Sequence, residues 1–555
     1  MNLKRSFMLI LAFVVLLSFT LAGCNPEPEK KVEVVNPVKV GKVYKFDPPV
    51  TITTIRFYGP NIKFIKGEDI DNNVWTRAYE SYCGIKLKSL FTVTDFAQFD
   101  LKVTTSIATD SLPDLIPVYT TLFFRISNSG KLADLKPAYD SFLNPDLKDL
   151  MEKANAGVAY NTCFRNGILA AIASPPDGSP GMQWIRQDWL DKFKLSWPKN
   201  INDSINIMKT FCSKNAGAPF ADKTFAMPFD TSLSPGFASA YGSYSGIWVD
   251  DGSGGLVRGE TQDKWKKVLQ LYSDLYNSEY IDPDFTLSNS TTLEGQMTNQ
   301  QFGMEFGSSS SPDGPMQKSL SLNPNAKDWK QSKILDEAGQ PAKVRLISRV
   351  TQFTCVNKNS KYPGAVMVLA NVYGQLLYGI GEKYRKYHDF FDSDGSVISS
   401  FFYPIVQMSY PPLDYTKLET KDPKKLTGEQ LGIISYFKSW AKNKDPISWR
   451  MWVIYKDGGA VETSKSILKD KNFYLDRAWG PETQAWIDKG PDLSQMQTQI
   501  FAKIVRGDFA SVDEGFNQWI TYFNNNGGAE ATTEINDWWK SQGKSSFAQM
   551  ADSIT

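Results

Sequence analysis

The sequence predicts an α/β fold in which mostly parallel sheets are flanked by helices. Residues 51–118 alternate between strand-like and helix-like patterns, which is the order of a parallel sheet with helices on its faces. The chain has 555 residues, more than one hydrophobic core usually holds, so we expect two or more domains. Its 41% hydrophobic and 22% charged residues are typical of a soluble globular protein.

The first 24 residues have the pattern of a secretory signal. Lys4 and Arg5 precede an apolar run that is too brief for its alternative, a resident membrane helix. The segment ends on Leu21-Ala22-Gly23-Cys24, which resembles the lipobox of bacterial lipoproteins. That resemblance implies a signal peptide over 1–23 and a mature chain whose first residue, Cys24, carries acyl chains such as palmitate. We therefore expect a lipid-anchored protein on the outer face of the cell membrane.

Residues 24–46 come next and are rich in proline and charge. Such a composition favours an extended, solvated chain over a packed one. We expect a flexible tether between the anchor and the folded body.

The first folded stretch predicts three strands that alternate with two helices. Because ligands of such sheets bind at the carboxyl ends of the strands, Tyr58 and the turn at 117–121 are placed to face a site. The predicted order is strand 51–58, helix 71–82, strand 85–93, helix 94–109 and strand 112–118.

Further along, apolar periodicity predicts a strand that runs into a helix over 182–193 and a helix that begins near 202. Residues 235–259 are loop-like and dense in rings, and 264–278 form an amphipathic helix. The apolar segment 364–380 is interrupted by polar residues, so we expect a buried helix there and not a membrane span.

Composition excludes several function classes. Sixty-one basic and 60 acidic side chains leave a net charge of +1, which gives no field to attract a nucleic acid. A single histidine, His388, rules out His-rich metal sites and leaves one candidate for a catalytic triad. Aromatic residues are 13% of the chain, and Trp and Tyr rings can stack on sugar faces as well as fill cores. We predict no cofactor and no bound metal.

Catalytic motifs are also missing from the sequence. It contains neither a G-x-S-x-G elbow nor a phosphate-binding loop. Close acidic pairs, which a glycosidase needs in space, occur at Asp69/Asp71, Asp250/Asp251 and Asp282/Asp284, where caps and solvated loops explain them. We therefore predict a protein that is not an enzyme.

Four cysteines remain after Cys24, and they lie far apart in the sequence without a C-x-x-C spacing. In an exported chain they could pair in any of three ways or stay as buried thiols. These four are Cys83, Cys163, Cys212 and Cys355.

Several short stretches together resemble the long, lipid-anchored members of family 1 extracellular solute-binding proteins. These are the sugar-capturing components of Gram-positive ABC importers, and the stretches keep the family's order along the chain. They are residues 110–116, 130–135, 184–193, 271–276, 281–285, 301–306, 480–483, 504–507 and 533–539.

The resemblance implies a periplasmic-binding-protein-like fold of type II, with two α/β lobes and a ligand cleft between them. On this chain, lobe 1 is expected over 47–170 and 350–410, and lobe 2 over 171–349 and 411–555. Two departures matter. The place of the relatives' calcium-like loop, 211–223, holds one acidic residue, so calcium is not carried over. A tryptophan that relatives often show after the 301–306 stretch is replaced here by serines.

The resemblance also implies that the chain captures an oligosaccharide or other carbohydrate, as a monomer, and delivers it to permease subunits of an ABC transporter. Two alternatives stay open: a surface lipoprotein enzyme acting on polysaccharide, and a peptide or signal receptor that feeds a sensor kinase. The candidate ligand-binding residues are Tyr58, Asp71, Trp184, Tyr241, Tyr244, Trp248, Phe306 and Trp479.

Overall fold

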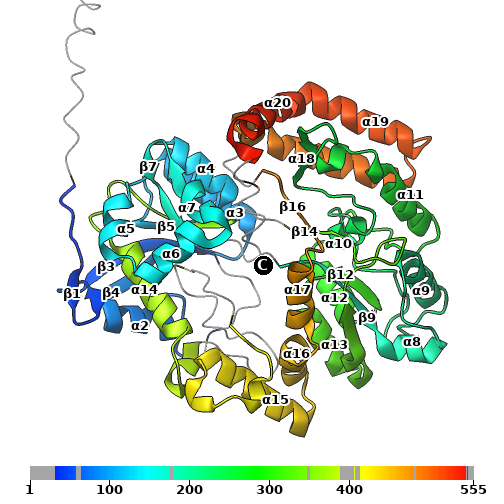
Figure 1. Cartoon of the computed structure of the whole chain (residues 1–555), viewed down its shortest axis with the longest axis horizontal. Coiled ribbons are helices and arrows are strands. Elements are labelled where there is room, and N and C mark those ends of the chain that lie inside the picture. The colour runs from blue at the N-terminus through cyan, green and yellow to red at the C-terminus, as the bar shows by residue number, and fades with distance from the viewer. Residues whose placement is uncertain are drawn as a thin grey trace, which may run out of the picture.

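The structure is a computed structural model of the whole chain, and it shows two α/β lobes side by side (Figure 1). It describes residues 32–57, 64, 66–174, 179–346, 350–387, 406, 413–478, 483–544 and 547. The predicted signal peptide, Cys24, Tyr58, His388 and Trp479 lie outside these residues. The two-lobed α/β class predicted from the sequence is confirmed.

The first lobe is built on a five-stranded sheet with the order β4-β3-β5-β15-β8. Strand β3 runs parallel to β4 and β5, whereas β15 is antiparallel to both β5 and β8. The three parallel strands are those predicted from the alternating segment, with nearly the same ends. The strands are β3 (Val50–Phe57), β4 (Ile85–Val93), β5 (Leu115–Tyr119), β8 (Ala171–Ala173) and β15 (Gln352–Val356).

Helices cover both faces of this sheet, and their ends follow local signals. Helix α2 begins after Asn73, whose side chain accepts from the Thr76 backbone while the Thr76 hydroxyl accepts from Asn73. The predicted buried helix over 364–380 is confirmed as α14, in which eleven of thirteen residues are buried. The helices are α2 (Val74–Cys83), α3 (Phe96–Ala108), α4 (Thr120–Asn128), α5 (Lys136–Phe142), α6 (Pro145–Lys153), α7 (Val158–Cys163) and α14 (Ala365–Leu377).

The described helices include none with the length and apolar character needed to cross a bilayer.

The end of the expected tether differs from the prediction. Strands β1 (Val38–Val40) and β2 (Val43–Lys45) form a hairpin around Gly41, whose positive φ of 63° suits a tight turn. Phe46 follows and is buried in the core of the first lobe. Alternating valines and one apolar ring outweigh the polar composition here, so the folded body begins earlier than residue 47. A second small hairpin, β6 (Phe164–Arg165) with β7 (Ile168–Leu169), precedes β8.

The second lobe contains a three-stranded sheet that is antiparallel throughout, which corrects the expectation of a mostly parallel one. Its central strand β9 (Met182–Arg186) pairs with β12 (Met304–Gly307) and with β13 (Trp329–Ser332). All five residues of β9 are buried. The sequence of β9, Met-Gln-Trp-Ile-Arg, carries no information on the direction of its neighbours.

Long helices enclose this second sheet. The predicted helix at 264–278 is confirmed as α11, with Trp265, Val268 and Tyr272 on its buried face. The helices are α8 (Gln187–Phe193), α9 (Ile201–Ser213), α10 (Pro235–Ser239), α11 (Lys264–Asn277), α12 (Ser290–Thr298), α13 (Gln317–Leu322), α15 (Gly428–Asn443), α16 (Pro446–Tyr455), α17 (Ala460–Lys469), α18 (Gln484–Arg506), α19 (Val512–Phe523) and α20 (Ala529–Trp538). The strand pairs β10 (Trp248–Asp250) with β11 (Leu256–Arg258) and β14 (Val344–Leu346) with β16 (Phe473–Leu475) complete the lobe.

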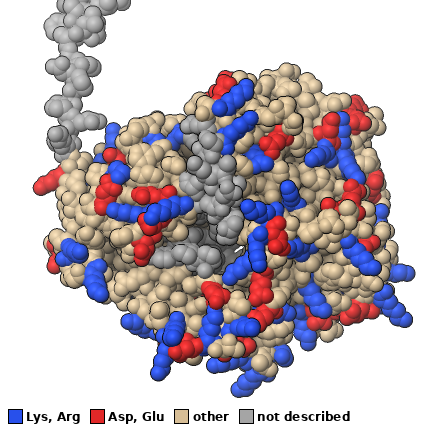
Figure 2. All heavy atoms as spheres, viewed as in Figure 1, with Lys and Arg blue, Asp and Glu red and all other residues tan. Residues whose placement is uncertain are grey.

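The two lobes also touch one another. Helix α15 packs against the short helix η5 (Glu382–Tyr387), which belongs to the first lobe. Val158 of α7 joins an apolar cluster that otherwise belongs to the second lobe, and Ile487 of α18 packs against the core of the first. Acidic and basic side chains are interspersed over the visible face of both lobes (Figure 2).

Candidate ligand-binding surface between the lobes

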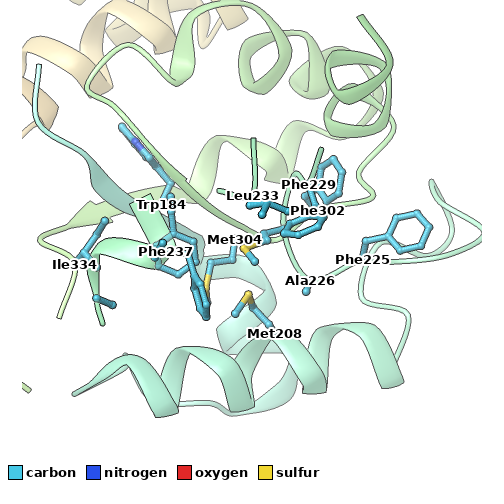
Figure 3. Packing of buried hydrophobic residues seen from close by; sticks show 14 of the residues in the cluster. Trp184, Met208, Phe225, Ala226, Phe229, Leu233, Phe237, Phe302, Met304 and Ile334 are labelled. Carbon is cyan, nitrogen blue, oxygen red and sulfur yellow. The ribbon is translucent and has the colours of Figure 1, made fainter. Parts of the chain in front are cut away.

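One face of the second sheet is directed toward the first lobe. The strand register places Glu305, Trp184 and Gln331 opposite one another in one row. The Gln331 amide donates to the carbonyl of Gly458, between α16 and α17, at 2.8 Å. These two helices lie on the side of the sheet nearest to the first lobe (Figure 1). In Figure 3 the Trp184 ring points away from Met208 and Met304, which pack on the other face.

A loop of four serines, Ser308–Ser311, follows β12 and covers the end of this row. The Trp184 indole N–H donates to the Ser308 carbonyl at 2.9 Å. The Ser311 hydroxyl accepts from the Ser308 backbone N–H at 3.0 Å and donates to Glu305 Oε1 at 2.9 Å. Gly307 permits this fold, because a Cβ there would lie 2.1 Å from Ser311 Oγ and 2.3 Å from Glu305 Oε1. Trp184 therefore supports the serine loop from below.

Glu305 is half-buried, and burial raises the pKa of its carboxyl from 4.5 to about 7, although the Ser311 hydroxyl acts in the opposite direction. Asp313, in the helical turn η3 (Pro312–Met316), behaves in the same way. Its side chain is 48% exposed, yet burial raises its pKa despite the opposing effect of Arg450. For both carboxyls, burial by neighbouring groups therefore outweighs the hydrogen bond or ion pair that favours the charged form.

The next feature is the ion pair between Arg450 of α16 and Asp313, with Arg450 Nη1 2.8 Å from Asp313 Oδ1. The Arg450 side chain is only 10% exposed. Helix α16 thus places the Arg450 guanidinium against the Asp313 carboxylate, which follows the serine loop. The pair fixes η3 against α16.

Further along α16, on another side of the helix, lies an aromatic pair. Tyr455 lies five residues after Arg450, which is about 7.5 Å along a helix axis, and its ring centroid is 4.7 Å from that of Tyr415. The Tyr415 hydroxyl donates to Glu429 Oε1 at 2.7 Å. Burial raises the pKa of Glu429, and the Tyr415 hydrogen bond opposes it. The Lys465 ammonium lies 5.7 Å from the Tyr415 ring centroid.

We call this set the interlobe surface. It combines carboxyls and hydroxyls that accept or donate hydrogen bonds, a guanidinium that is held in place, and two partly buried tyrosine rings. These are the groups that orient a ligand with many hydroxyls in a concave site. Its residues are Glu305, Ser308–Ser311, Asp313, Tyr415, Glu429, Arg450 and Tyr455.

Two of the residues predicted from the sequence lie beside this surface, and both are buried. Trp184 is fully buried and contributes through its hydrogen bond to the serine loop. Phe306 is 8% exposed and meets Phe237 edge to face at 5.2 Å. Because strand residues alternate between faces, burial of Phe306 on one face places Glu305 on the other, with Trp184 and Ser311.

The other described candidates are engaged in local packing. Trp248 is buried in β10, with the Arg258 guanidinium 5.3 Å from its ring centroid. Tyr244 donates to the Lys343 carbonyl at 2.8 Å, and its ring stacks on Tyr474 at 4.6 Å.

Tyr241 carries the Lys267 ammonium 5.3 Å from its ring centroid. Asp71 accepts from the backbone N–H of Ser89 at 3.1 Å and from its hydroxyl at 2.7 Å, which ties the loop before α2 to β4. Their roles in ligand binding stay predictions, as do those of Tyr58 and Trp479, which lie outside the described residues.

The next two features are candidate metal ligands and cysteines in the described parts of the chain. They hold no group of three or more His, Cys, Asp or Glu side chains that could bind a metal ion. Cys83, Cys163, Cys212 and Cys355 are free thiols. Burial raises the pKa of Cys83 and Cys212 to about 12.

Comparison with known proteins shows which proteins this chain is similar to. No family model matches the chain. A polygalacturonan/rhamnogalacturonan-binding protein of Bacillus subtilis (strain 168) is 21% identical over 211 residues, which span 37% of this chain and 41% of that protein. This match therefore covers less than half of the relative's length.

Solved structures align over nearly the whole folded body. An alginate-binding protein solved without calcium ion has a TM-score of 0.59 at 14% identity and covers 89% of this chain and 99% of its own. A substrate-binding protein of an S. pneumoniae ABC transporter, in complex with kestose, scores 0.58 at 15% identity, with coverage of 89% and 100%. An HMO-binding solute-binding protein from Bifidobacterium longum infantis scores 0.60 at 13% identity, with coverage of 89% and 99%. The chain therefore has the two-lobed fold of solute-binding proteins associated with ABC transporters.

Proposed function

We propose that this chain is an extracellular solute-binding protein that captures an oligosaccharide between its lobes and delivers it to the permease subunits of an ABC transporter. The observation that carries the proposal is the interlobe surface, where the Glu305 and Asp313 carboxyls stand beside the serine loop and the Arg450 guanidinium. The fold neighbours support it, because the proteins similar to this chain include binders of alginate, kestose and polygalacturonan/rhamnogalacturonan.

The binding step follows from the geometry of two lobes side by side. A sugar presents hydroxyls at its rim and apolar C–H groups on its faces, so carboxyls and serines bind the rim while tyrosine rings cover the faces. Closure of the lobes removes water and strengthens each hydrogen bond. A ligand that contacts both lobes shifts the population toward the closed form, which a permease can distinguish from the empty one.

The proposal includes a lipid anchor at Cys24, supported by the lipobox-like end of the signal segment. One acyl chain binds a membrane only marginally, so stable anchoring requires at least two. Tethering raises the local concentration of the loaded protein at the permease.

The direct test is a thermal-shift screen over mono- and oligosaccharides, followed by calorimetric titration of each sugar that raises the melting temperature. Saturable binding with the sugar recovered unchanged supports the proposal. Shortened sugar products in the recovered material would instead favour the enzyme alternative. A shift with peptides and none with any sugar would contradict carbohydrate capture. Binding of the loaded protein to a sensor kinase and not to permease subunits would contradict transport.

A further inference from the structure

Exposed apolar side chains are concentrated at the hairpin of β1 and β2. Twelve large apolar side chains are exposed among the described residues, and four of them, all valines, lie within residues 34–40. They are Val34, Val35, Val38 and Val40, each 41–49% exposed. Single exposed apolar residues are ordinary on a soluble protein, whereas a cluster marks a surface that contacts something else.

The strand register shows which face of the hairpin is open. Tyr44 packs edge to face on Phe142 of α5, with ring centroids 5.2 Å apart, so its face of the hairpin lies against the first lobe. Val43 is its neighbour in β2 and therefore points to the other face. Val40 lies opposite Val43, and Val38 is two residues away on the same strand, so both share that outer face. The exposed valines thus belong to a formed sheet face.

Lysines surround the valine face. Lys39 and Lys42 are exposed, and neither is paired with an acidic side chain in the described part of the chain. Lys361 is exposed too, and its carbonyl accepts from the Val35 backbone N–H at 2.8 Å, which brings this residue beside the valines. Residues 30–45 hold five lysines and one acidic residue, whereas the whole chain has a net charge of only +1. Apolar side chains flanked by cations suit the surface of an anionic bilayer.

The position of the hairpin in the chain brings it close to such a surface. Val34 lies 10 residues after Cys24, which carries the lipid anchor in the proposed function. Ten residues span at most about 36 Å when fully extended, and a flexible linker of this length averages roughly 15–20 Å. Figure 1 shows β1 at the edge of the first lobe that is farthest from the second lobe. An anchored chain therefore holds this edge of the body near the membrane.

We propose that residues 34–45, with Lys361, dock on the anionic lipid surface that holds the anchor; this rests on the lipid anchor of the proposed function. The valines enter the boundary between headgroups and acyl chains, and the lysines meet the lipid phosphates. This contact is too weak to retain a protein without an anchor, but the tether makes it intramolecular and so effective. Docking fixes the orientation of the first lobe, which a flexible tether alone leaves free.

The direct test measures vesicle binding of residues 25–555, a chain that lacks the acylated cysteine and keeps every described residue. In sedimentation assays we expect binding to vesicles of phosphatidylglycerol and phosphatidylcholine in about equal parts. Binding to pure phosphatidylcholine should be at least about tenfold weaker, and binding to the anionic vesicles should fall as salt rises from about 0.05 M to 0.5 M. Equal binding to both lipids, or binding to neither, would overturn the proposal.

Two double variants test the assigned residues. Lys39→Gln with Lys42→Gln should lower the partition onto anionic vesicles about thirtyfold, since one lysine near such a surface contributes about 1 kcal/mol. Val38→Thr with Val40→Thr keeps the β-branched shape that suits a strand and should lower the partition about threefold or more, because less apolar surface is buried.

The control is Lys209→Gln with Lys214→Gln, which changes the net charge equally. Both lysines are exposed, in α9 and at its C-cap, and α9 lies at the opposite edge of the molecule (Figure 1). We expect its partition to stay within about twofold of wild type. Melting curves of all variants confirm folding. A loss in the control as large as that in the hairpin variants would overturn the assignment to the hairpin.

The remaining outcomes separate docking from the proposed function. Sugar binding without vesicle binding overturns the docking surface and leaves carbohydrate capture in place. Vesicle binding without binding of any sugar supports docking and overturns carbohydrate capture. A dimer of residues 25–555 that dissociates in the double threonine variant would identify a second copy of the chain as the occupant of the valine face, and would overturn the proposal.

Discussion

Replacement of Glu305 by glutamine should stabilise the protein at neutral and alkaline pH. The carboxyl is half-buried beside the serine loop, and its pKa rises from 4.5 to about 7 because burial disfavours the charged form. At 1.36 kcal/mol per pKa unit, ionised Glu305 costs the folded state about 3 kcal/mol. Glutamine keeps the shape and the acceptor for Ser311 without that charge.

The sign of the pH dependence follows from the raised pKa. Below about pH 4.5 the carboxyl is protonated in both folded and unfolded chains, and wild type and Glu305→Gln should be equally stable. Between about pH 4.5 and 7 the unfolded chain releases its proton first, so wild type loses stability progressively relative to the variant. Above about pH 7 the difference should be constant, near 3 kcal/mol.

The assay is denaturant unfolding of both proteins over this pH range, with Glu337→Gln as control. Glu337 is an exposed glutamate paired with Lys267 on the surface of the same lobe, so the same chemical change there should show no comparable pH dependence. At roughly 2–4 °C per kcal/mol, the melting temperature of Glu305→Gln should rise by several degrees at about pH 8. If the difference in free energy of unfolding between wild type and Glu305→Gln stays constant from about pH 4 to pH 8, the assigned burial of this carboxyl is refuted.

Three further changes probe the site and the anchor. Gly307→Ala should push the Ser311 hydroxyl and the Glu305 carboxylate, two side-chain ends that can turn away, out of their hydrogen bond and so weaken sugar binding with little change in melting temperature; wild-type affinity would show that these two groups do not bind the sugar. Tyr415→Phe removes the donor to Glu429 and should lower the free energy of unfolding by about 1–3 kcal/mol. The loss should be larger at pH 8 than at pH 5, because the hydrogen bond favours the ionised acid. Equal losses at both pH values in denaturant titrations would contradict this. Cys24→Ala should release the protein into the medium with its ligand affinity intact, which cell fractionation and calorimetry measure; continued membrane association would exclude the lipid anchor.

The secondary structure of this chain was largely predictable because its signals are local. The strand at 85–93 and the helix at 264–278 lie where their apolar periodicity placed them. Strand direction in the second sheet was not predictable, since the sequence of β9, Met-Gln-Trp-Ile-Arg, fits either arrangement. The hairpin ending at Lys45 was also missed, because short alternating valines stood within a charged segment.

The binding surface was harder to predict than the fold for a physical reason. The sequence prediction favours large rings as ligand-binding residues, but Trp248 and Tyr244 fill cores. Sequence alone does not separate a core ring from an exposed one. The Asp313–Arg450 pair joins distant parts of the chain. Glu305 was the residue that a local signal could have revealed, because it alternates with buried Met304 and Phe306 in a strand.

The central claim is that a sugar binds between the lobes, and a crystal structure of the chain with a saturating neutral oligosaccharide tests it most directly. The account predicts electron density for the sugar at the interlobe surface, with hydroxyls in hydrogen-bond distance of Glu305 and the Ser308–Ser311 loop and a ring face against Tyr415 or Tyr455. A sugar bound elsewhere, with these groups contacting only protein and water, would contradict it.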